Sequence, residues 1–576
     1  MSTALPKDYR GTPWQKIVDA WLSQNGAPVP GERHQKLLRM AGDLRYLCDN
    51  NPAWLRQIVA LAPYVKDMLG EGADDEVSKL CTDACGRKTW MSTPRRVLDL
   101  MAAAGISDAA RKKGAENLPD PSLYDTFYQR LKPLLAPPYD AATYYVDDAN
   151  KLGAVFASGT MFCTLMTRCH YLHYDGEQHR MNPQTFIIGD PAAGKSFADR
   201  LDRIIMGALK AADRPGREAE AEYKRKQQER ATSSKEQKGE ALKRPTLPIR
   251  YLPSRTSNAI FYRRLQNAVE ETGGDVVNLH LYTFDSELDS NTTAQSGGAW
   301  IGKHDLELKA FHNEYTGVDY ANSDSVNDIL PVFYNTVCTG TPISLARKIT
   351  LRNVNDGYCS RIAVFRMLPD AYKMVRRGKP NVNHEKDCEL KQWAFRFDQL
   401  RGEMNIGRLV DYTYDLCEQS AFEAEASSDR VLDYLRKRAV FYAQWLTVPR
   451  IAARAFLEHK DEPQLATPEN WTVTDDDLRF AQLMYDAVIY WQDRFFGQML
   501  EESWENAAKE FMPRKRRSRN DALFATLPQN FTPQLLSEMM GWSGNAARRQ
   551  CERWEATGLI QKKGNGYEKK SSTVGL

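Results

Sequence analysis

The strongest constraint on the fold is a complete G-x-x-x-x-G-K-S motif directly after the apolar run 185–188, formed by Gly189, Asp190, Pro191, Ala192, Ala193, Gly194, Lys195 and Ser196. Two glycines allow a tight turn whose backbone N–H groups point inward, which suits a chain of phosphates. We expect Lys195 to reach the β- and γ-phosphates and the Ser196 hydroxyl to bind Mg²⁺. With a strand before the loop and a helix predicted at residues 197–209, the motif predicts binding of ATP and Mg²⁺. The alternative is a glycine turn with a solvated lysine.

Length and composition predict a soluble protein with several domains. The chain has 576 residues, which is too long for one hydrophobic core. The net charge is only +3, so any nucleic-acid site must come from local clusters and not from a global field. The first residues have no apolar signal core and no stretch of eighteen apolar residues occurs, so we expect a cytoplasmic protein without contact to a membrane. The ten cysteines include no paired CxxC, which favours reduced thiols.

Changes in periodicity and composition divide the chain into five predicted segments. They are an N-terminal helical domain at 1–115, a helical connector at 116–180, a P-loop core at 181–370 with a charged excursion at 213–250, a helical lid at 371–512, and a basic linker with a small C-terminal domain at 513–576. The excursion has almost no large apolar side chains, so we expect an exposed helix or a solvated arm. Because strand and helix signals alternate through the core, a parallel sheet is predicted around the nucleotide.

A pair of carboxylates follows a second predicted strand. Residues 276–284 form an apolar run, and the chain continues as Asp285, Ser286 and Glu287. Hydrolysis needs a carboxylate on the metal side and a group that orients water, so we expect Asp285 to bind Mg²⁺ and Glu287 to act as the base. The two acids are usually adjacent, whereas here Ser286 separates them, so either one could bind the metal. The alternative is two exposed acids at a strand end.

The apolar run 331–338 ends in the sequence Thr-Gly-Thr-Pro. A polar side chain at the end of the strand beside the acidic one can touch the γ-phosphate and report hydrolysis. Thr339 is the first candidate for this role, and Thr341 and Asn335 are further candidates. The alternative is that these residues only form a turn.

A single arginine, Arg361, stands just before a predicted buried strand at 362–365. An arginine there is awkward in a core but well suited to reach the triphosphate of a neighbouring subunit. Such an arginine finger raises the hydrolysis rate by roughly 10³- to 10⁵-fold. The alternative is a salt bridge within the chain.

The C-terminal residues predict a winged helix. Residues 532–541 form a helix with a glycine turn, residues 545–557 a second helix, and residues 561–570 a basic hairpin. This arrangement would lay the second helix in the major groove of duplex DNA and the hairpin on phosphates. The candidate DNA-binding residues are Arg548, Arg549, Arg553, Lys562 and Lys563. Such domains also dock proteins, which is the alternative, and the basic run 514–519 either adds phosphate affinity or is a solvated linker.

Together these patterns predict an α/β P-loop NTPase core with flanking all-α domains and a C-terminal winged helix. The P-loop, the run Pro253–Ile260, Glu287, the Thr-Gly-Thr-Pro turn and the Arg361 segment occur in one order. In that order they resemble the primase-helicase ATPases of phages, plasmids and mobile elements. That group is similar to the minichromosome maintenance helicases in placing a Ser-Arg finger after the sensor strand. The resemblance covers about residues 144–496.

The resemblance implies an AAA+ ATPase that assembles as a homo-hexameric ring around DNA, with single-stranded DNA in the pore. Residues 436–439 resemble part of the helical lid of that group, so Arg438 or Arg436 could contact nucleotide as a second sensor. Residues 31–39 resemble a helical domain that follows a primase catalytic domain in related fusions. No primase acid cluster precedes them, so priming would need a separate polypeptide.

Three functions are compatible with these patterns. The first is a DNA helicase or translocase that serves replication of a mobile element. The second is a DNA-binding initiator or regulator in which ATP only switches assembly, and the third is an ATPase that acts on protein. Only the first requires pore loops that grip DNA, for which the candidates are Lys303, His304 and Lys309. The alternative for these three is ordinary exposed charge.

Overall fold

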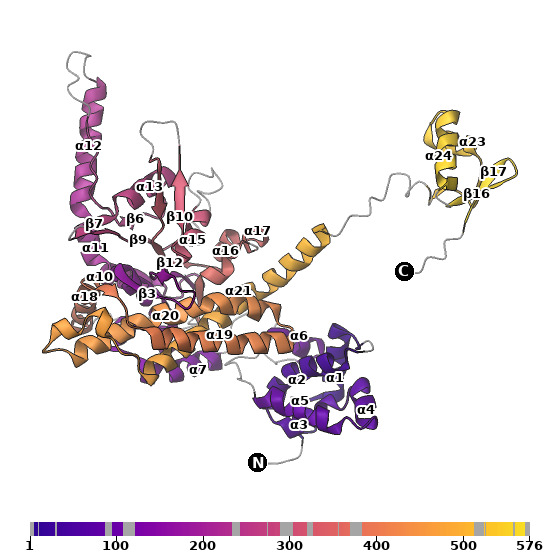
Figure 1. Ribbon diagram of the computed structural model, residues 1–576, viewed down its shortest axis with the longest axis horizontal. Coiled ribbons are helices and arrows are strands. Elements are labelled where there is room, and N and C mark those ends of the chain that lie inside the picture. The colour runs from indigo at the N-terminus through magenta and orange to yellow at the C-terminus, as the bar shows by residue number, and fades with distance from the viewer. Residues whose placement is uncertain are drawn as a thin grey trace. The chain divides into compact units, whose positions relative to one another are not determined.

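The computed structural model forms two compact units, residues 1–503 and 504–576, which are described separately (Figure 1). It describes residues 5–9, 11–28, 31–86, 95–106, 121–232, 242–272, 275–288, 303–319, 326–354, 356–368, 383–511, 524, 526–556 and 559–570. The division falls inside the long helix α21 (Asp475–Phe511), and the predicted boundaries within the large unit stay predictions.

The large unit is a mixed α/β structure, mostly helical, around a five-stranded sheet that is parallel throughout. Its strands are β5 (Gln184–Ile188), β6 (Tyr251–Leu252), β9 (Leu281–Asp285), β12 (Tyr334–Gly340) and β13 (Ala363–Arg366). Their order is β13-β5-β12-β9-β6. The predicted parallel sheet is therefore confirmed, and it is consistent with a Rossmann-like or P-loop core.

Helices cover both faces of this sheet. Consecutive residues of a strand point to opposite faces, so neighbouring residues of β5 contact helices on the two sides. On β5, Thr185 contacts Thr160 of α9 (Lys151–Leu165), with the two hydroxyl oxygens 2.7 Å apart. Its neighbour Gln184 donates to the main chain of α15 (His304–Phe311) on the other side. Helix α9 is buried nearly all round, as its apolar sequence predicts. At Gly153 the strand β13 approaches so closely that an added Cβ would lie 2.5 Å from the Phe365 ring.

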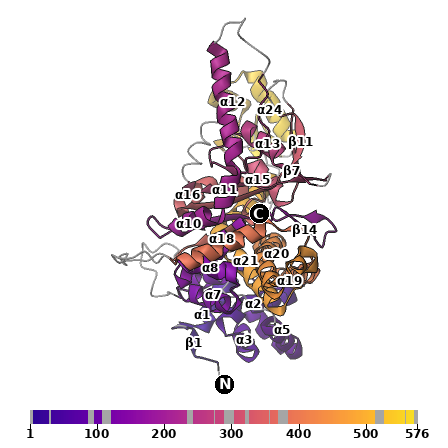
Figure 2. The ribbon, with the colours of Figure 1, turned by 90° about the vertical axis from the view of Figure 1, so that its left-hand side faces the viewer.

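The segment after the P-loop consists of three helices, α10 (Ser196–Ile205), α11 (Gly207–Ala212) and α12 (Arg214–Thr232). The single helix predicted at 197–209 is thus interrupted at Met206, which lies outside helical geometry with ψ 6°. The exposed helix predicted for the charged excursion is confirmed as α12. It extends away from the sheet in Figures 1 and 2, and residues 233–241 lie outside the described part.

The strand predicted before the acids differs from the structure. Residues 276–284 are two strands, because β8 (Asp275–Asn278) pairs with β7 (Val269–Thr272) as a hairpin and only β9 joins the parallel sheet. The break lies at buried His280, whose Nδ1 is 2.8 Å from Thr167 Oγ1 and whose carbonyl accepts from Arg250 Nε at 3.0 Å. A second hairpin, β10 (Tyr315–Val318) with β11 (Asp328–Pro331), precedes β12.

The predicted helical connector contains helices and strands. Its helices are α7 (Pro121–Leu131), α8 (Pro137–Thr143) and α9. The prediction of a helical connector at 116–180 is wrong after α9, because β3 (Arg168–Leu172) follows and pairs with β4 (Gln178–His179) and β14 (Arg401–Glu403).

The predicted helical character of the N-terminal segment is confirmed within the described residues. It comprises a short pair of strands and the helices α1 (Trp14–Asn25), α2 (Arg33–Leu44), α3 (Pro52–Val59), α4 (Pro63–Gly70), α5 (Asp74–Gly86) and α6 (Arg95–Ala103). The Trp21 indole donates to Asp43 at 2.8 Å. Arg96 pairs with Asp43 and also with Asp429, which directly precedes α20 (Arg430–Glu458). These ion pairs tie α2 and α6 to the helices of the lid segment.

The lid segment is helical, as predicted. It contains α18 (His384–Asp398), α19 (Gly407–Ser427), α20 (Arg430–Glu458) and α21. Between β12 and β13 lie the short helices α16 (Pro342–Lys348) and α17 (Leu351–Val354), and α13 (Asn258–Asn267) follows β6. None of the helices in the described ranges combines the length and apolar character needed to cross a bilayer.

The small unit contains the predicted helix, turn, second helix and hairpin. These are α23 (Pro533–Met540), α24 (Gly544–Ala556) and the hairpin β16 (Ile560–Lys563) with β17 (Gly566–Lys569), joined by β15 (Asn530–Phe531) in one sheet. Gly541 ends α23 with φ 62°, a conformation that favours glycine. Leu536, Trp554 and Ile560 pack in its core.

Candidate nucleotide-binding site

The P-loop lies at the carboxyl end of β5 and has the shape of an anion cradle. Its first residue is held against the sheet, since the Gly189 N–H donates to the Gly340 carbonyl at 3.0 Å. Ala192 and Gly194 have positive φ values of 64° and 80°. Alternating right- and left-handed residues turn successive N–H groups into one concavity, and α10 then begins at Ser196 with its positive end toward the loop. The loop therefore fits phosphate groups.

Lys195 is held inside the loop by its own main chain. Its Nζ donates to the carbonyls of Gly189 at 2.9 Å and Asp190 at 2.8 Å. Burial lowers the pKa of Lys195. The carboxylate of Asp190 opposes this shift, and the positive charge of nearby Arg366 adds to it. A lysine bound only to carbonyls can exchange them for phosphate oxygens, which are stronger acceptors because they are charged.

Arg366 is a residue of the loop region that sequence reasoning missed. It ends β13 directly beside Ile188, the last residue of β5, and its Nη2 pairs with Asp190 Oδ1 at 2.7 Å. Arg366 is 8% exposed, and its Nη1 has no hydrogen-bond partner among the described residues. The available signal was a lone arginine closing the apolar run 362–365. Arg366 thus braces the P-loop from the neighbouring strand and keeps one donor uncommitted.

The two acids lie at the same edge of the sheet but differ in exposure. Asp285 ends β9 and is 3% exposed, whereas Glu287 is exposed to solvent. The Glu287 N–H donates to Asp285 Oδ1 at 3.2 Å, so Asp285 also fixes the turn that carries Glu287. Among the described residues, no cluster of three or more histidine, cysteine or acidic side chains could hold a metal. A hydroxyl from Ser196 and one carboxylate nevertheless suit Mg²⁺, which usually keeps several waters and binds substrate phosphates.

Thr339 connects the acidic turn to the neighbouring strand. It lies near the end of β12 beside Ile187, and its hydroxyl donates to the Ser286 carbonyl at 2.6 Å. The other two sensor candidates have structural roles instead. Thr341 caps α16 by accepting from the Ser344 N–H at 3.2 Å, and Asn335 lies at the opposite end of β12, where its amide donates to Thr164 at 2.9 Å.

Arg361 and Arg438 come together at the edge of the sheet opposite the P-loop. Arg361 precedes β13, and its Nη1 donates to the Asp356 carbonyl at 3.2 Å, while Arg438 donates to Ser360 Oγ at 3.0 Å. In the described part of the chain neither guanidinium has a carboxylate partner, and both Nε atoms lack a hydrogen bond. Burial and the charge of Arg438 lower the pKa of Arg361 to about 10. The salt bridge considered for Arg361 is therefore absent from the described residues.

Arg438 does not approach the P-loop of its own chain, because the P-loop follows the carboxyl end of β5 and Arg438 contacts residues before β13. Arg436, the other candidate for a second sensor, pairs with Asp433 and donates to the Cys417 carbonyl at 3.2 Å. Arg436 therefore holds α19 and α20 together.

The candidate DNA-gripping residues do not form an exposed basic loop. Lys303 is 6% exposed, and its Nζ donates to the Thr256 carbonyl at 2.9 Å. Burial lowers the pKa of Lys303. His304 lies 3.2 Å from Asp356, and Lys309 pairs with Asp305 at 3.0 Å. The prediction is thus wrong for Lys303, which is buried because α15 packs its first turn against the loop after β6.

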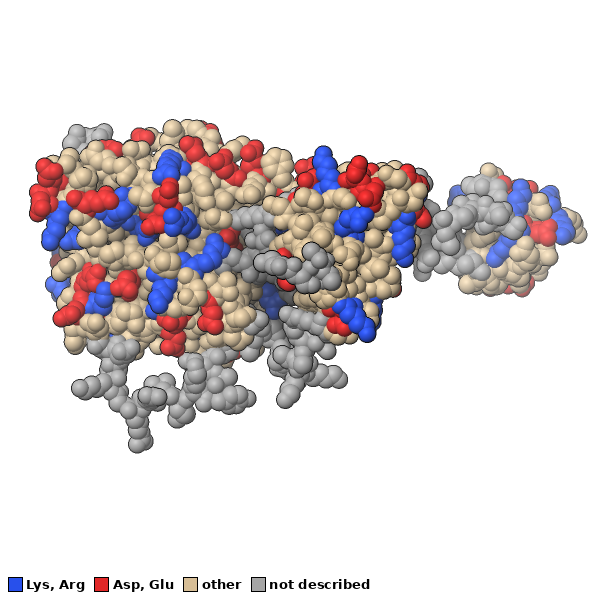
Figure 3. All heavy atoms as spheres, turned by 90° about the horizontal axis from the view of Figure 1, so that it is seen from below, with Lys and Arg blue, Asp and Glu red and all other residues tan. Residues whose placement is uncertain are grey.

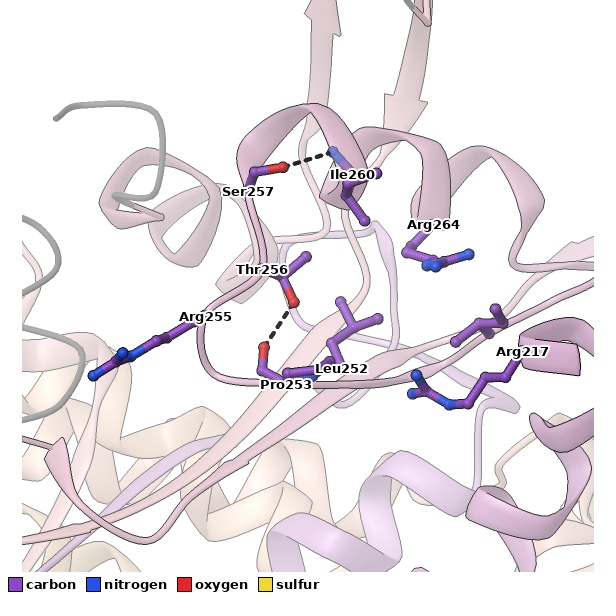
Figure 4. Close-up of a pocket in the computed structure, with 9 residues that line it drawn as sticks. Arg217, Leu252, Pro253, Arg255, Thr256, Ser257, Ile260 and Arg264 are labelled. Atoms are coloured by element: carbon purple, nitrogen blue, oxygen red, sulfur yellow. Dashed lines mark hydrogen bonds between the residues drawn. The ribbon is translucent and has the colours of Figure 1, made fainter. Parts of the chain in front are cut away.

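A pocket of about 310 Å³ lies on the other side of that loop, between α12, β6 and α13 (Figure 4). Leu252 and Ile260 line it together with Arg217 and Arg264, while Arg255 points away from them in Figure 4. Arg264 is already paired with Glu220 of α12, with Nη2 and Oε2 2.7 Å apart. Because β6 is the edge strand farthest from β5 in the sheet, this pocket is separate from the P-loop.

The five candidate DNA-binding residues lie on two elements of the small unit. Arg548, Arg549 and Arg553 are exposed on α24, and Lys562 and Lys563 are exposed on β16. Lys563 also pairs with Glu568 on the facing strand at 3.0 Å. The helix and the hairpin thus both present basic side chains to solvent.

Comparison with known proteins adds no evidence on function, since no protein-family model matches the chain and no curated protein does.

We expect Arg366→Ala to weaken ATP binding about tenfold. The substitution removes the charged partner of Asp190, and the P-loop then loses the contact that holds it against β13. Isothermal titration calorimetry of purified protein would measure this. Arg401→Ala, which removes an exposed arginine from β14, is the matched control and leaves affinity unchanged. Equal affinities for both variants would contradict the role given to Arg366.

Proposed function

We propose that the protein is an ATPase of the AAA+ type that works as a homo-hexameric DNA helicase or translocase and supports replication of a mobile genetic element. The observation that carries the proposal is the strand order β13-β5-β12-β9-β6. In it the P-loop strand and the acidic strand are separated by one strand, β12, whose next-to-last residue is Thr339. A polar sensor between cradle and acids is the arrangement that the sequence motifs led us to expect.

In this proposal, the residues at the carboxyl edge of the sheet have separate roles in hydrolysis. Lys195 and the N–H groups of the loop hold the phosphates, and Ser196 with Asp285 holds Mg²⁺, which neutralises charge on the phosphate oxygens. Exposed Glu287 is the better candidate for orienting water, because buried Asp285 already braces the turn. Thr339 is bonded to that turn and so responds to its position.

Completion of the site by a neighbouring protomer follows from the position of the arginines. Arg361 and Arg438 lie at the amino edge of the sheet, and the P-loop lies at the carboxyl edge. The nucleotide that these two arginines would contact is therefore the one bound by another chain. Two guanidiniums that have no carboxylate partner within the described ranges carry a cost of like-charge repulsion, which a bound polyphosphate would relieve. A ring of identical subunits supplies such a neighbour at every interface.

DNA is the proposed partner of both units. We propose that the small unit is a winged helix that places α24 in the major groove of duplex DNA and β16 on phosphates. On the face shown in Figure 3, basic and acidic side chains are interspersed. We propose that duplex affinity comes from the local cluster of basic residues on α24 and β16. Single-stranded DNA would occupy the ring, and priming would fall to a separate primase.

A second candidate function is an ATP-switched initiator or regulator that binds duplex DNA without strong unwinding. The exposed basic helix α24 favours it equally. We expect single-stranded DNA to accelerate ATP turnover about tenfold or more if the protein is a motor, since grip and hydrolysis are then coupled. A steady-state phosphate-release assay with and without an oligonucleotide measures this. Tight duplex binding without acceleration would favour the initiator.

For the nucleotide site, we expect Lys195→Ala to abolish ATP binding or hydrolysis. Arg361→Ala should retain nucleotide binding and lose turnover roughly 10³-fold, because it removes charge stabilisation only in the transition state. Mixing Arg361→Ala with Glu287→Gln subunits should restore part of the turnover, since the second variant still donates its own arginine. An unrestored mixture would argue against a shared interface.

For the small unit, deletion of residues 520–576 should weaken duplex DNA binding and reduce its salt dependence, while ATP turnover survives. Replacing Arg548, Arg549 and Arg553 together with alanine should lower the slope of log affinity against log salt by up to about three, one for each lost phosphate contact. Fluorescence anisotropy at several salt concentrations measures the slope. Replacing exposed Lys391, Arg401 and Lys460 instead is the charge-matched control.

A further inference from the structure

The turn that carries Arg361 is held by α15. Tyr358 in that turn is fully buried, and its hydroxyl donates to Glu307 Oε2 at 2.6 Å. His304, one helical turn earlier on α15, lies 3.2 Å from Asp356 and packs its ring 4.8 Å from that of Tyr358. The Asp356 carbonyl in turn accepts from Arg361 Nη1 at 3.2 Å. Contacts with α15 thus hold Asp356 and Tyr358, which belong to the turn against which the Arg361 guanidinium lies.

Glu307 joins this turn to the helix that follows the sensor strand. Its Oε1 pairs with Lys348 Nζ at 3.2 Å, and both side chains are only 9% exposed. Lys348 is the last residue of α16, which begins next to Thr339 at the other edge of the sheet. The Lys348 ammonium also lies over the rings of Phe186 and Tyr358, at 5.4 and 5.7 Å. The Glu307 carboxylate therefore accepts a hydrogen bond from Tyr358, in the turn that carries Arg361, and forms an ion pair with Lys348 of α16.

These contacts keep Glu307 charged although it is buried. Burial opposes its ionisation, but Lys348 and the Tyr358 hydroxyl outweigh burial and lower the pKa of Glu307. A buried carboxylate is costly to maintain unless its partners satisfy it, and removal of one partner leaves the other charge unpaired. Its main-chain carbonyl is also used, since it accepts from Gln184 Nε2 of the P-loop strand at 2.6 Å.

We propose that Glu307 is a positioning residue for Arg361: through Tyr358 it sets where this chain's arginine is presented to the nucleotide of the next protomer. The inference rests on the proposed function, in which Arg361 acts across an interface. It assigns Glu307 to the interface that the chain offers and not to the nucleotide that the chain binds. A loss at Glu307 should therefore harm the neighbour's turnover and spare the chain's own cradle.

The test measures turnover in mixed rings. We expect Glu307→Gln and Tyr358→Phe to lower turnover about 10- to 100-fold, as a misplacement near 1 Å does, with ATP affinity within twofold of the starting protein. Tyr358→Phe removes only the hydroxyl and keeps the Glu307–Lys348 pair, so it remains informative if Glu307→Gln fails to fold. Asp305→Asn, on the exposed side of α15, is the matched control and keeps full turnover.

Each variant is then mixed one to one with Glu287→Gln subunits, which bind ATP and donate an intact Arg361. Random mixing pairs the variant's cradle with an intact finger at about a quarter of the interfaces, and turnover should rise toward that fraction of the starting rate. A purely structural defect, or one in the variant's own cradle, would not be rescued.

The mixture of Arg361→Ala with Glu287→Gln is the reference. If the reference is rescued and both the Glu307 and Tyr358 mixtures are not, the role of Glu307 is wrong and the shared interface stands. If the reference itself is not rescued, the proposed function fails. Unchanged turnover of Tyr358→Phe on its own would also overturn the positioning role.

Discussion

The arrangement of this protein depends on the parallel pairing of β5, β12 and β9. In a parallel sheet all carboxyl ends meet at one edge, so the residues that follow three separate strands become neighbours. The pairing aligns Thr339 with Ile187 and Cys338 with Asp285. A slip of one residue would turn every side chain of a strand to the opposite face. The register therefore fixes the P-loop, the turn with Asp285 and Glu287, and Thr339 relative to one another.

The same sheet separates two kinds of chemistry by its two edges. The carboxyl edge gathers backbone N–H groups, Lys195 and the acids, which suit phosphates and a cation. The amino edge gathers Arg361 and Arg438, which carry positive charge without carboxylate partners in the described residues. A single molecule cannot bring both edges to one nucleotide. This separation is the physical reason for proposing that neighbouring copies complete each other.

Buried polar contacts connect the two edges through the layer of α15 and α16. Thr339 is hydrogen-bonded to the acidic turn, α16 starts three residues later, and Lys348 at its end reaches Glu307. Glu307 in turn accepts a hydrogen bond from Tyr358, in the turn that carries Arg361. Buried ion pairs of this kind add little net stability, because desolvation offsets much of the attraction. Their geometric specificity is the more useful property, since they hold helices at defined positions relative to the sheet.

Local sequence determined the P-loop, the strand before it, the exposed helix of the charged excursion and the helix-turn-helix with its hairpin, because each depends on a short pattern of glycines, charges or periodicity. It did not reveal that Arg366 braces Asp190, that Lys303 is buried, or that Asn335 and Thr341 serve packing and capping. Those outcomes depend on which strands are neighbours and in which register, and strand neighbours are set by contacts between residues far apart in the chain. Tertiary structure alone decided that Arg361 and Arg438 share one edge while the P-loop occupies the other.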